Sequence, residues 1–141
     1  MAATARAARG TTSRPSVWFS VLAGLTSLVI LLQGLWAGLF VPLGEGGVYT
    51  ERWVDVHATG SLVALVLALA TTVAAFVTAR DQRVLWGGAL LLTVLVAVEG
   101  WIGALVEGGS RGAAAIHIPL ALLIMSITVW LPLRARQARR A

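Results

Sequence analysis

Four apolar stretches occupy most of this chain, and each is long enough to cross a lipid bilayer as a helix. They cover about residues 17–42, 54–78, 84–106 and 113–133 of a chain of 141 residues. Since a helix rises about 1.5 Å per residue, about 20 residues span the roughly 30 Å of a bilayer's hydrocarbon core. Apolar residues make up 58% of the chain and charged residues only 12%, too few for the surface of a soluble domain. The sequence therefore predicts an all-α integral membrane protein.

The connections between these stretches are short, which places consecutive helices side by side and antiparallel. The expected architecture is an up-down-up-down four-helix bundle. The first stretch has no cleavage-site pattern before Pro42, so we expect a retained span rather than a signal peptide. The expected divisions are a disordered arm over 1–15, a transmembrane domain over 16–133 and a basic tail over 134–141.

Helix boundaries are indicated by residues that cap or interrupt helices. Thr50, Asp81 and Ser110 are the expected N-caps of the second, third and fourth helices, because their side chains can accept a hydrogen bond from the first turn. Proline cannot continue the helical hydrogen bonding, so we expect the fourth helix to end near Pro132.

The basic residues lie mostly on one side of the predicted bundle. Nine of the eleven, all of them arginine, flank the two ends of the apolar region or separate the second stretch from the third: Arg6, Arg9, Arg14, Arg80, Arg83, Arg134, Arg136, Arg139 and Arg140. Such an excess is typical of cytoplasmic connections, so we expect both termini in the cytoplasm. The net charge of +5 then reflects topology and attraction to lipid headgroups, not nucleic-acid binding. Arginine without lysine is typical of a GC-rich bacterial genome, and we expect a multi-pass protein of a bacterial plasma membrane.

The two halves of the chain repeat one pattern, a polar residue in one apolar stretch followed by a histidine in the next. Gln33 precedes His57, and Glu99 precedes His117; these are the only two histidines. The two hairpins are therefore expected to be parallel repeats about a pseudo-two-fold axis along the membrane normal. Both histidines lie near the start of their helices, so they would face each other across the bundle at one depth, in the outer leaflet.

Two neutral imidazoles presented in this way are the axial ligands that a b-type haem requires. The sequence therefore predicts one haem b, with its iron bound by His57 and His117. The chain has no cysteine, which excludes thiol and iron–sulfur chemistry, and zinc or iron alone would need a third ligand. The alternative interpretation is two interfacial histidines hydrogen-bonded to backbone or lipid.

Small and basic residues near the histidines fit a haem pocket. Gly60 and Gly103 would let a flat macrocycle come close, although the same residues also suit plain helix packing. Arg52 and Arg111 immediately precede the histidine-bearing helices, and arginine binds carboxylates such as haem propionates well. The alternative role for both arginines is that of interfacial anchors.

Glu99 is the only acid well inside an apolar stretch, where a carboxylate must be neutralised or paired. It could hydrogen-bond Gln33 across the repeat axis, or orient an imidazole through its Nδ1–H group. A proton-coupled transporter would use such a glutamate too. We favour a supporting role for Glu99 beside the haem.

At these residues the chain resembles one half of a haem A synthase, a family built from two four-helix bundles with histidines on the second and fourth helices of each. It also resembles small four-helix actinobacterial membrane proteins with the same histidine placement. The residues that carry the resemblance are Gln33-Gly34…Gly38, Glu99-Gly100…Gly103, Val56-His57 and Ala115-Ile116-His117-Ile118-Pro119-Leu120.

The chain also departs from the synthase pattern. The family has a catalytic carboxylate shortly before a substrate-side histidine that an arginine usually follows, whereas here Asp55 stands two residues before His57 and Ala58 follows it. One histidine pair is enough for one haem only. The resemblance therefore implies the haem-b-binding half without the catalytic half, unless a homodimer supplies a second site.

We therefore expect a cytochrome-like membrane protein rather than an enzyme. Its expected role is electron transfer, or that of a haem-handling accessory to respiratory or haem-biosynthesis membrane proteins. The alternatives are a small non-haem transporter that uses Glu99, and a structural subunit of a membrane complex.

Overall fold

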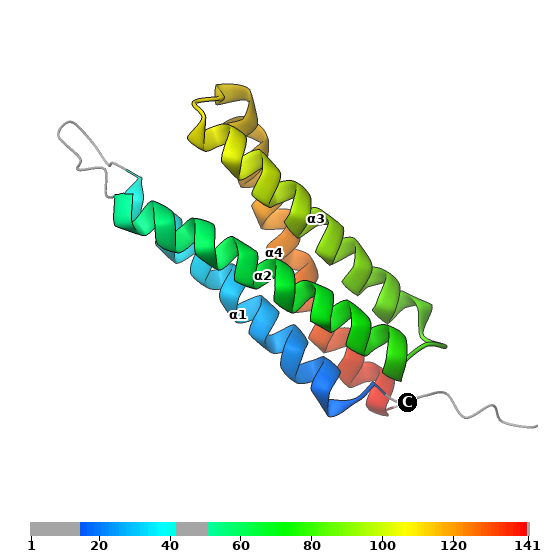
Figure 1. Ribbon diagram of the computed structural model, residues 1–141. Helices are drawn as coiled ribbons and strands as arrows, with labels where there is room; N and C mark the ends of the chain where they lie inside the picture. Colours follow the sequence, from blue (N-terminus) through cyan, green and yellow to red (C-terminus); the bar gives the residue numbers. More distant parts are fainter. Residues whose placement is uncertain (1–14, 42–50, 141) are drawn as a thin grey trace, which may run out of the picture.

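Four long α-helices make up the described part of the chain, residues 15–41 and 51–140 of the computed structural model (Figure 1). They are α1 (Val17–Phe40), α2 (Glu51–Thr78), α3 (Arg83–Glu107) and α4 (Arg111–Arg140). Each is long and apolar enough to cross a membrane. The outward-facing side chains of Leu31, Leu62 and Leu122 are 59%, 65% and 66% exposed, which suits contact with lipid. The predicted all-α, membrane-spanning architecture is confirmed.

The helices form a bundle in which each packs against its two neighbours. α1 packs on α2 and α4, and α3 packs on α2 and α4. Within the described residues, the diagonal pairs α1–α3 and α2–α4 have no close backbone contact. This is the predicted up-down-up-down order. The expected arm lies almost wholly in residues 1–14, and it and the Thr50 cap lie outside the described residues.

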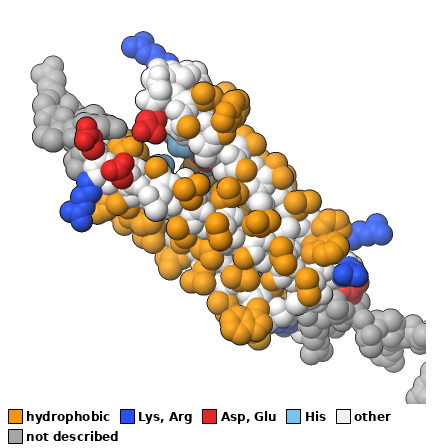
Figure 2. All heavy atoms as spheres, viewed as in Figure 1, with side chains coloured by type: hydrophobic (Ala, Val, Ile, Leu, Met, Phe, Trp, Pro, Cys, Tyr) orange, Lys and Arg blue, Asp and Glu red, His pale blue; other side chains and the backbone are white. Residues whose placement is uncertain are grey.

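The two ends of the bundle differ in charge. We call one the acidic end; it holds the start of α2 and the α3–α4 turn and carries Glu51, Asp55 and Glu107. The other, the basic end, carries the arginines Arg80, Arg83, Arg134, Arg136, Arg139 and Arg140. Hydrophobic side chains cover the surface between the two ends (Figure 2).

Small side chains dominate the interior and recur at the three- or four-residue spacing of a helix face. The buried positions, large and small together, are Phe19, Ala23, Thr26 and Ile30 in α1, Gly60, Ala64, Ala68, Thr71 and Ala75 in α2, Leu85, Ala89, Leu92, Val96 and Ile102 in α3, and Ala113, Ile124, Thr128, Leu131 and Ala135 in α4. The contiguous hydrophobic cluster extends from the basic end only as far as Ile30, Ala64, Val96 and Ile124. Beyond it, the α1–α2 and α3–α4 hairpins diverge towards the acidic end (Figure 1).

Hydroxyl groups link the helices inside the cluster. The hydroxyls of Thr26 and Thr71 lie 3.1 Å apart between α1 and α2, and those of Thr72 and Thr93 lie 2.9 Å apart between α2 and α3. At the basic end, Arg139 of α4 donates to the Ser16 carbonyl at 3.2 Å and to the Ser20 hydroxyl. Because lipid offers no competing hydrogen bonds, such contacts add stability to the bundle. They also make the pairing of helices more specific than apolar packing alone does.

The fourth helix continues through Pro132 to Arg140, so the predicted end of the helix near Pro132 is wrong, and residues 134–140 are helical. Pro132 has no N–H group to donate to the Thr128 carbonyl. The Ser27 hydroxyl of α1 lies 2.8 Å from that carbonyl oxygen and replaces the missing donor. It also lies 2.8 Å from the Ala23 carbonyl of its own helix, so its one proton is shared. A serine on a neighbouring helix thus satisfies the group that proline leaves open.

The helix caps agree with the sequence in one case and differ in another. Ser110 Oγ accepts a hydrogen bond of 3.3 Å from the Ala113 N–H group, as predicted for the start of α4. The N-cap of α3 is Gln82, not Asp81, and its side chain makes no capping hydrogen bond. The Gln82 carbonyl instead accepts from the N–H groups of Leu85 and Trp86, which begins the helix one residue later than expected.

Candidate functional site

Four polar side chains, one from each helix, lie where the hydrophobic cluster ends; we call Gln33, His57, Glu99 and His117 the polar layer. Each lies three or four residues from a buried position of its own helix: Gln33 after Ile30, His57 before Gly60, Glu99 after Val96, and His117 after Ala113. The layer therefore continues the inward-facing stripes of all four helices. Polar groups replace the apolar core at this level.

The two histidine rings meet inside the layer. Their centroids are 6.4 Å apart and their planes are inclined by 71°. The helices that carry them, α2 and α4, are diagonal in the bundle, so the side chains reach across its axis. The structure thus brings together the two residues that the sequence suggested as a pair.

Each histidine has its Nδ1 close to an oxygen atom of the repeat-related residue in its own hairpin. His57 Nδ1 lies 3.1 Å from the Gln33 carbonyl oxygen, and His117 Nδ1 lies 3.2 Å from Glu99 Oε1. The first contact uses the backbone and the second a side chain. The two hairpins therefore orient their imidazoles in parallel ways with different acceptors.

Glu99 contacts His117 rather than Gln33, which decides between the two structural roles that the sequence left open. The Glu99 side chain is 15% exposed and that of His117 is 23% exposed. Their approach is close enough for an ion pair, but it is not aligned well enough for a full hydrogen bond. Within the described residues, the Gln33 amide is buried with neither its nitrogen nor its oxygen hydrogen-bonded.

These contacts fix which ring nitrogen carries the proton. A backbone carbonyl can only accept, so His57 must donate through Nδ1–H. The Glu99 carboxyl group beside His117 Nδ1 favours a proton on that nitrogen. Within the described residues, neither Nε2 atom has a hydrogen-bond partner. A neutral ring protonated on Nδ1 presents an Nε2 lone pair, which is the form that binds a metal.

A hollow opens between the two hairpins at the acidic end, and histidine atoms are visible inside it (Figure 2). His57 belongs to the α1–α2 hairpin and His117 to the α3–α4 hairpin, the two hairpins that diverge at this end (Figure 1).

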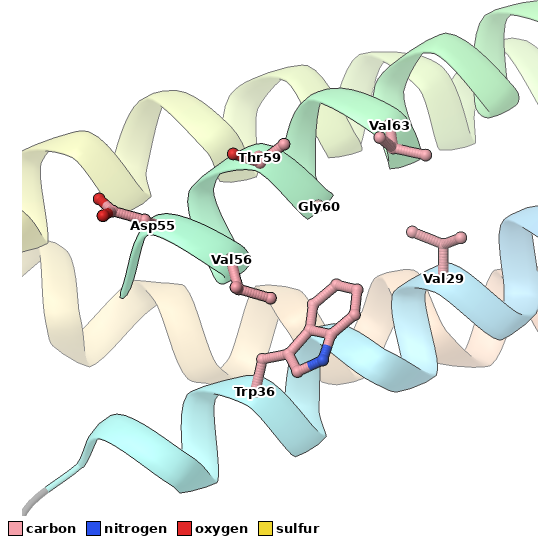
Figure 3. Close-up of a pocket in the computed structure, with 7 residues that line it drawn as sticks. All are labelled: Val29, Trp36, Asp55, Val56, Thr59, Gly60 and Val63. Atoms are coloured by element: carbon pink, nitrogen blue, oxygen red, sulfur yellow. The ribbon is translucent and has the colours of Figure 1, made fainter. Parts of the chain in front are cut away.

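The two predicted glycines serve different contacts. Gly103 lies against the His117 ring, where a Cβ atom would be 3.4 Å from Cε1. Gly60 lies inside the α1–α2 hairpin, where a Cβ atom would overlap Gln33 Nε2 and the Trp36 ring. Figure 3 shows the Trp36 side chain extending from α1 towards Gly60. Helix packing alone thus accounts for the small size of Gly60.

A groove of about 360 Å³ lies on the α1–α2 hairpin beside Trp36 and Gly60 (Figure 3). Its lining is Val29, Trp36, Asp55, Val56, Thr59, Gly60 and Val63, which includes neither histidine nor Glu99. The groove is therefore separate from the polar layer.

The predicted arginines lie at the acidic end without touching the histidines in the described structure. The Arg52 guanidinium lies over the Trp53 ring, 5.9 Å from its centroid, and Arg111 is exposed at the start of α4. Sequence reasoning missed Phe40, whose ring centroid is 5.4 Å from that of His57. The available signal was its spacing of two helical turns from Gln33 on the same face of α1.

Among the described residues, no three histidine, aspartate or glutamate side chains are grouped closely enough to hold a metal ion by themselves. The donor set at the polar layer is two imidazoles, which by itself suits a metal whose other ligands come from a macrocycle. Comparison of the chain with protein-family models, with curated proteins and with solved structures finds no match.

Proposed function

We propose that the polar layer binds one haem b between His57 and His117, and that the protein serves electron transfer or haem handling in a bacterial plasma membrane. The observation that carries the proposal is the arrangement of the rings, with each Nδ1 engaged and each Nε2 without a partner among the described residues. Outer contacts of this kind orient histidine ligands in metal sites.

The ring separation supports the same assignment. A metal–imidazole bond is about 2 Å and the ring centre lies about 1 Å further, so two imidazoles that would share one metal have centres no more than about 6 Å apart. The observed separation is 6.4 Å. The hollow between the hairpins offers a flat ligand a way in from the acidic end.

In this role the chain's own residues would hold the haem and orient the two imidazoles. The Gln33 carbonyl and the Glu99 carboxylate fix the two imidazoles, and Gly103 leaves room for the His117 ring. Arg52 and Arg111 supply positive charge at the acidic end, which would suit the carboxylates of a bound haem. Haem b supplies one-electron redox chemistry when bound. The resemblance to half of a haem A synthase fits a binding role without the family's catalytic carboxylate.

The test is the absorption spectrum of the purified protein, produced with an adequate supply of haem. We expect a six-coordinate low-spin haem b spectrum that His57→Ala and His117→Ala each abolish. Asp55→Asn is the matched control, because Asp55 lies on the same helix as His57 but lines the separate groove. A colourless wild-type protein, or two single histidine variants that keep the wild-type spectrum, would overturn the proposal.

A second candidate is proton-coupled transport through Glu99. The observation that favours it is a carboxylate in an apolar helix, 15% exposed and beside a histidine. It becomes the leading candidate if the folded protein binds no haem and vesicles containing it show proton-driven uptake that Glu99→Gln abolishes.

A further inference from the structure

A second groove lies at the basic end, between the first turn of α3 and the last turns of α4. It has a volume of about 520 Å³. Val84, Leu85 and Ala138 form its apolar part, and its polar lining is Asp81, Gln82, Arg83, Arg134 and Gln137. The groove is at the opposite end of the bundle from the polar layer, so an inference about it is independent of haem binding.

Positive charge dominates this groove. Arg83 and Arg134 lie on different helices, and neither guanidinium has an ion-pair partner among the described residues. Arg134 donates one hydrogen bond of 3.1 Å to Gln137 Oε1, which leaves most of its donors available. Asp81 also lines the groove, so two positive charges stand against one negative charge.

The surroundings match the boundary between lipid headgroups and acyl chains. Trp86 and Trp130 lie within two turns of the groove along α3 and α4, and tryptophan is enriched at membrane interfaces. Val84 and Leu133, next to the two groove arginines in the sequence, are 52% and 50% exposed. A ligand seated here would meet cationic groups at one end and an apolar surface at the other.

We propose that this groove binds the headgroup of one anionic glycerophospholipid, with its phosphate between Arg83 and Arg134. The acyl chains run along the exposed apolar surface that includes Val84 and Leu133. Guanidinium groups bind phosphate through paired, charge-assisted hydrogen bonds, which two arginines on separate helices can supply from both sides. A bound lipid would then link the start of α3 to the end of α4.

The test is native mass spectrometry of the full chain in detergent, titrated with phosphatidylglycerol or with phosphatidylcholine. We expect one tightly held phosphatidylglycerol, and an affinity about tenfold lower in the variant Arg83→Gln/Arg134→Gln. The matched control Arg136→Gln/Arg140→Gln removes the same amount of charge from exposed positions at the same end of the bundle. We expect it to keep the affinity for phosphatidylglycerol within about twofold of wild type.

Four results would overturn the proposal, the fourth of them in a variant used only if the glutamine variant does not fold. Equal losses in the groove variant and the control would indicate diffuse attraction to anionic lipid. Equal binding of phosphatidylcholine would remove the requirement for negative charge. Displacement of the lipid by millimolar inorganic phosphate would indicate a site for free phosphate. If the glutamine variant does not fold, Arg83→Lys/Arg134→Lys replaces it, because lysine keeps both charges but lacks the planar guanidinium group. We expect this variant to bind phosphatidylglycerol measurably more weakly than wild type. Wild-type affinity in this variant would also overturn the proposal.

Discussion

Ser27 and Thr128 are 101 residues apart in sequence, yet the Ser27 hydroxyl lies 2.8 Å from the Thr128 carbonyl oxygen. Within α4, Pro132 has no N–H group that could donate a hydrogen bond to that carbonyl. The contact satisfies the open carbonyl where α4 continues through a proline to Arg140, and it links α4 to α1 inside the hydrophobic cluster.

Replacing Ser27 with alanine should therefore destabilise the protein only while Pro132 is present. We expect Ser27→Ala to lower the free energy of unfolding by about 1 kcal/mol, because a buried carbonyl loses its donor. In a Pro132→Ala background the restored N–H group should make the same change nearly neutral. A double-mutant cycle by denaturant titration in one detergent measures this coupling. Ser126→Ala is the control, since its hydroxyl bonds only to Leu122 of its own helix; equal costs in both backgrounds would contradict the prediction.

Gly60 should not tolerate a larger residue. In Gly60→Ala the new methyl group would overlap the Gln33 amide and the Trp36 ring, so α1 and α2 must separate or both side chains must move. We expect a loss of about 1–3 kcal/mol in stability, as for overpacking in other cores. Gly100→Ala is the comparison, because nothing lies within 4 Å of the position that its methyl group would occupy. Thermal unfolding of both variants under identical conditions checks this, and a Gly60→Ala variant as stable as Gly100→Ala would disprove the contact.

The two substitutions at Glu99 should differ. Glu99→Gln keeps an oxygen acceptor for His117 Nδ1–H and reproduces the residue at the repeat-related position, Gln33, so folding and haem content should change little. Glu99→Leu leaves His117 Nδ1 without an acceptor and should lower the free energy of unfolding by about 1–2 kcal/mol. We also expect this variant to bind less haem. Haem occupancy and thermal stability are measured side by side. If the leucine variant matches wild type in both, Glu99 does not hold the imidazole.

Reporter fusions can determine the orientation in the membrane. The arginine distribution predicts that a phosphatase active only outside the cytoplasm is active when fused at residue 108 and inactive when fused at the C-terminus. The opposite pattern would place the basic end outside and the histidines in the inner leaflet. Growth and expression level of each fusion provide the control for failed insertion.

The bundle and its polar layer follow from patterns that can be read in the sequence. The membrane spans are predictable because about 20 apolar residues are needed to cross the bilayer. The histidine pair is predictable because His57 and His117 occupy matching places in the two repeats. The neighbours of these residues were less predictable. Gln33 and Glu99 both lie on inward faces, and the choice of Glu99 for His117 depends on side-chain rotamers that periodicity does not encode.

The errors arose where a residue's local preference is changed by its neighbours in space. Pro132 ends a helix in isolation, but a serine on another helix replaces its missing hydrogen bond. At Gly60 the sequence left both a haem pocket and plain helix packing open, and the atoms that a Cβ there would overlap belong to Trp36 and Gln33. In both cases the deciding contact comes from α1, far from the residue in the chain, so a local reading of the sequence cannot include it.

The polar layer also limits how the helices can assemble. The apolar side chains of these helices can contact lipid at almost any rotation of a helix about its axis. Apolar packing alone therefore specifies that rotation poorly. Turning α3 by half a turn would place the Glu99 carboxylate among acyl chains, at a cost of about 3 kcal/mol if it stayed ionised. Turning α2 or α4 would likewise expose an imidazole. The layer therefore determines the rotational register in which four independently inserted helices come together, whether or not a ligand is present.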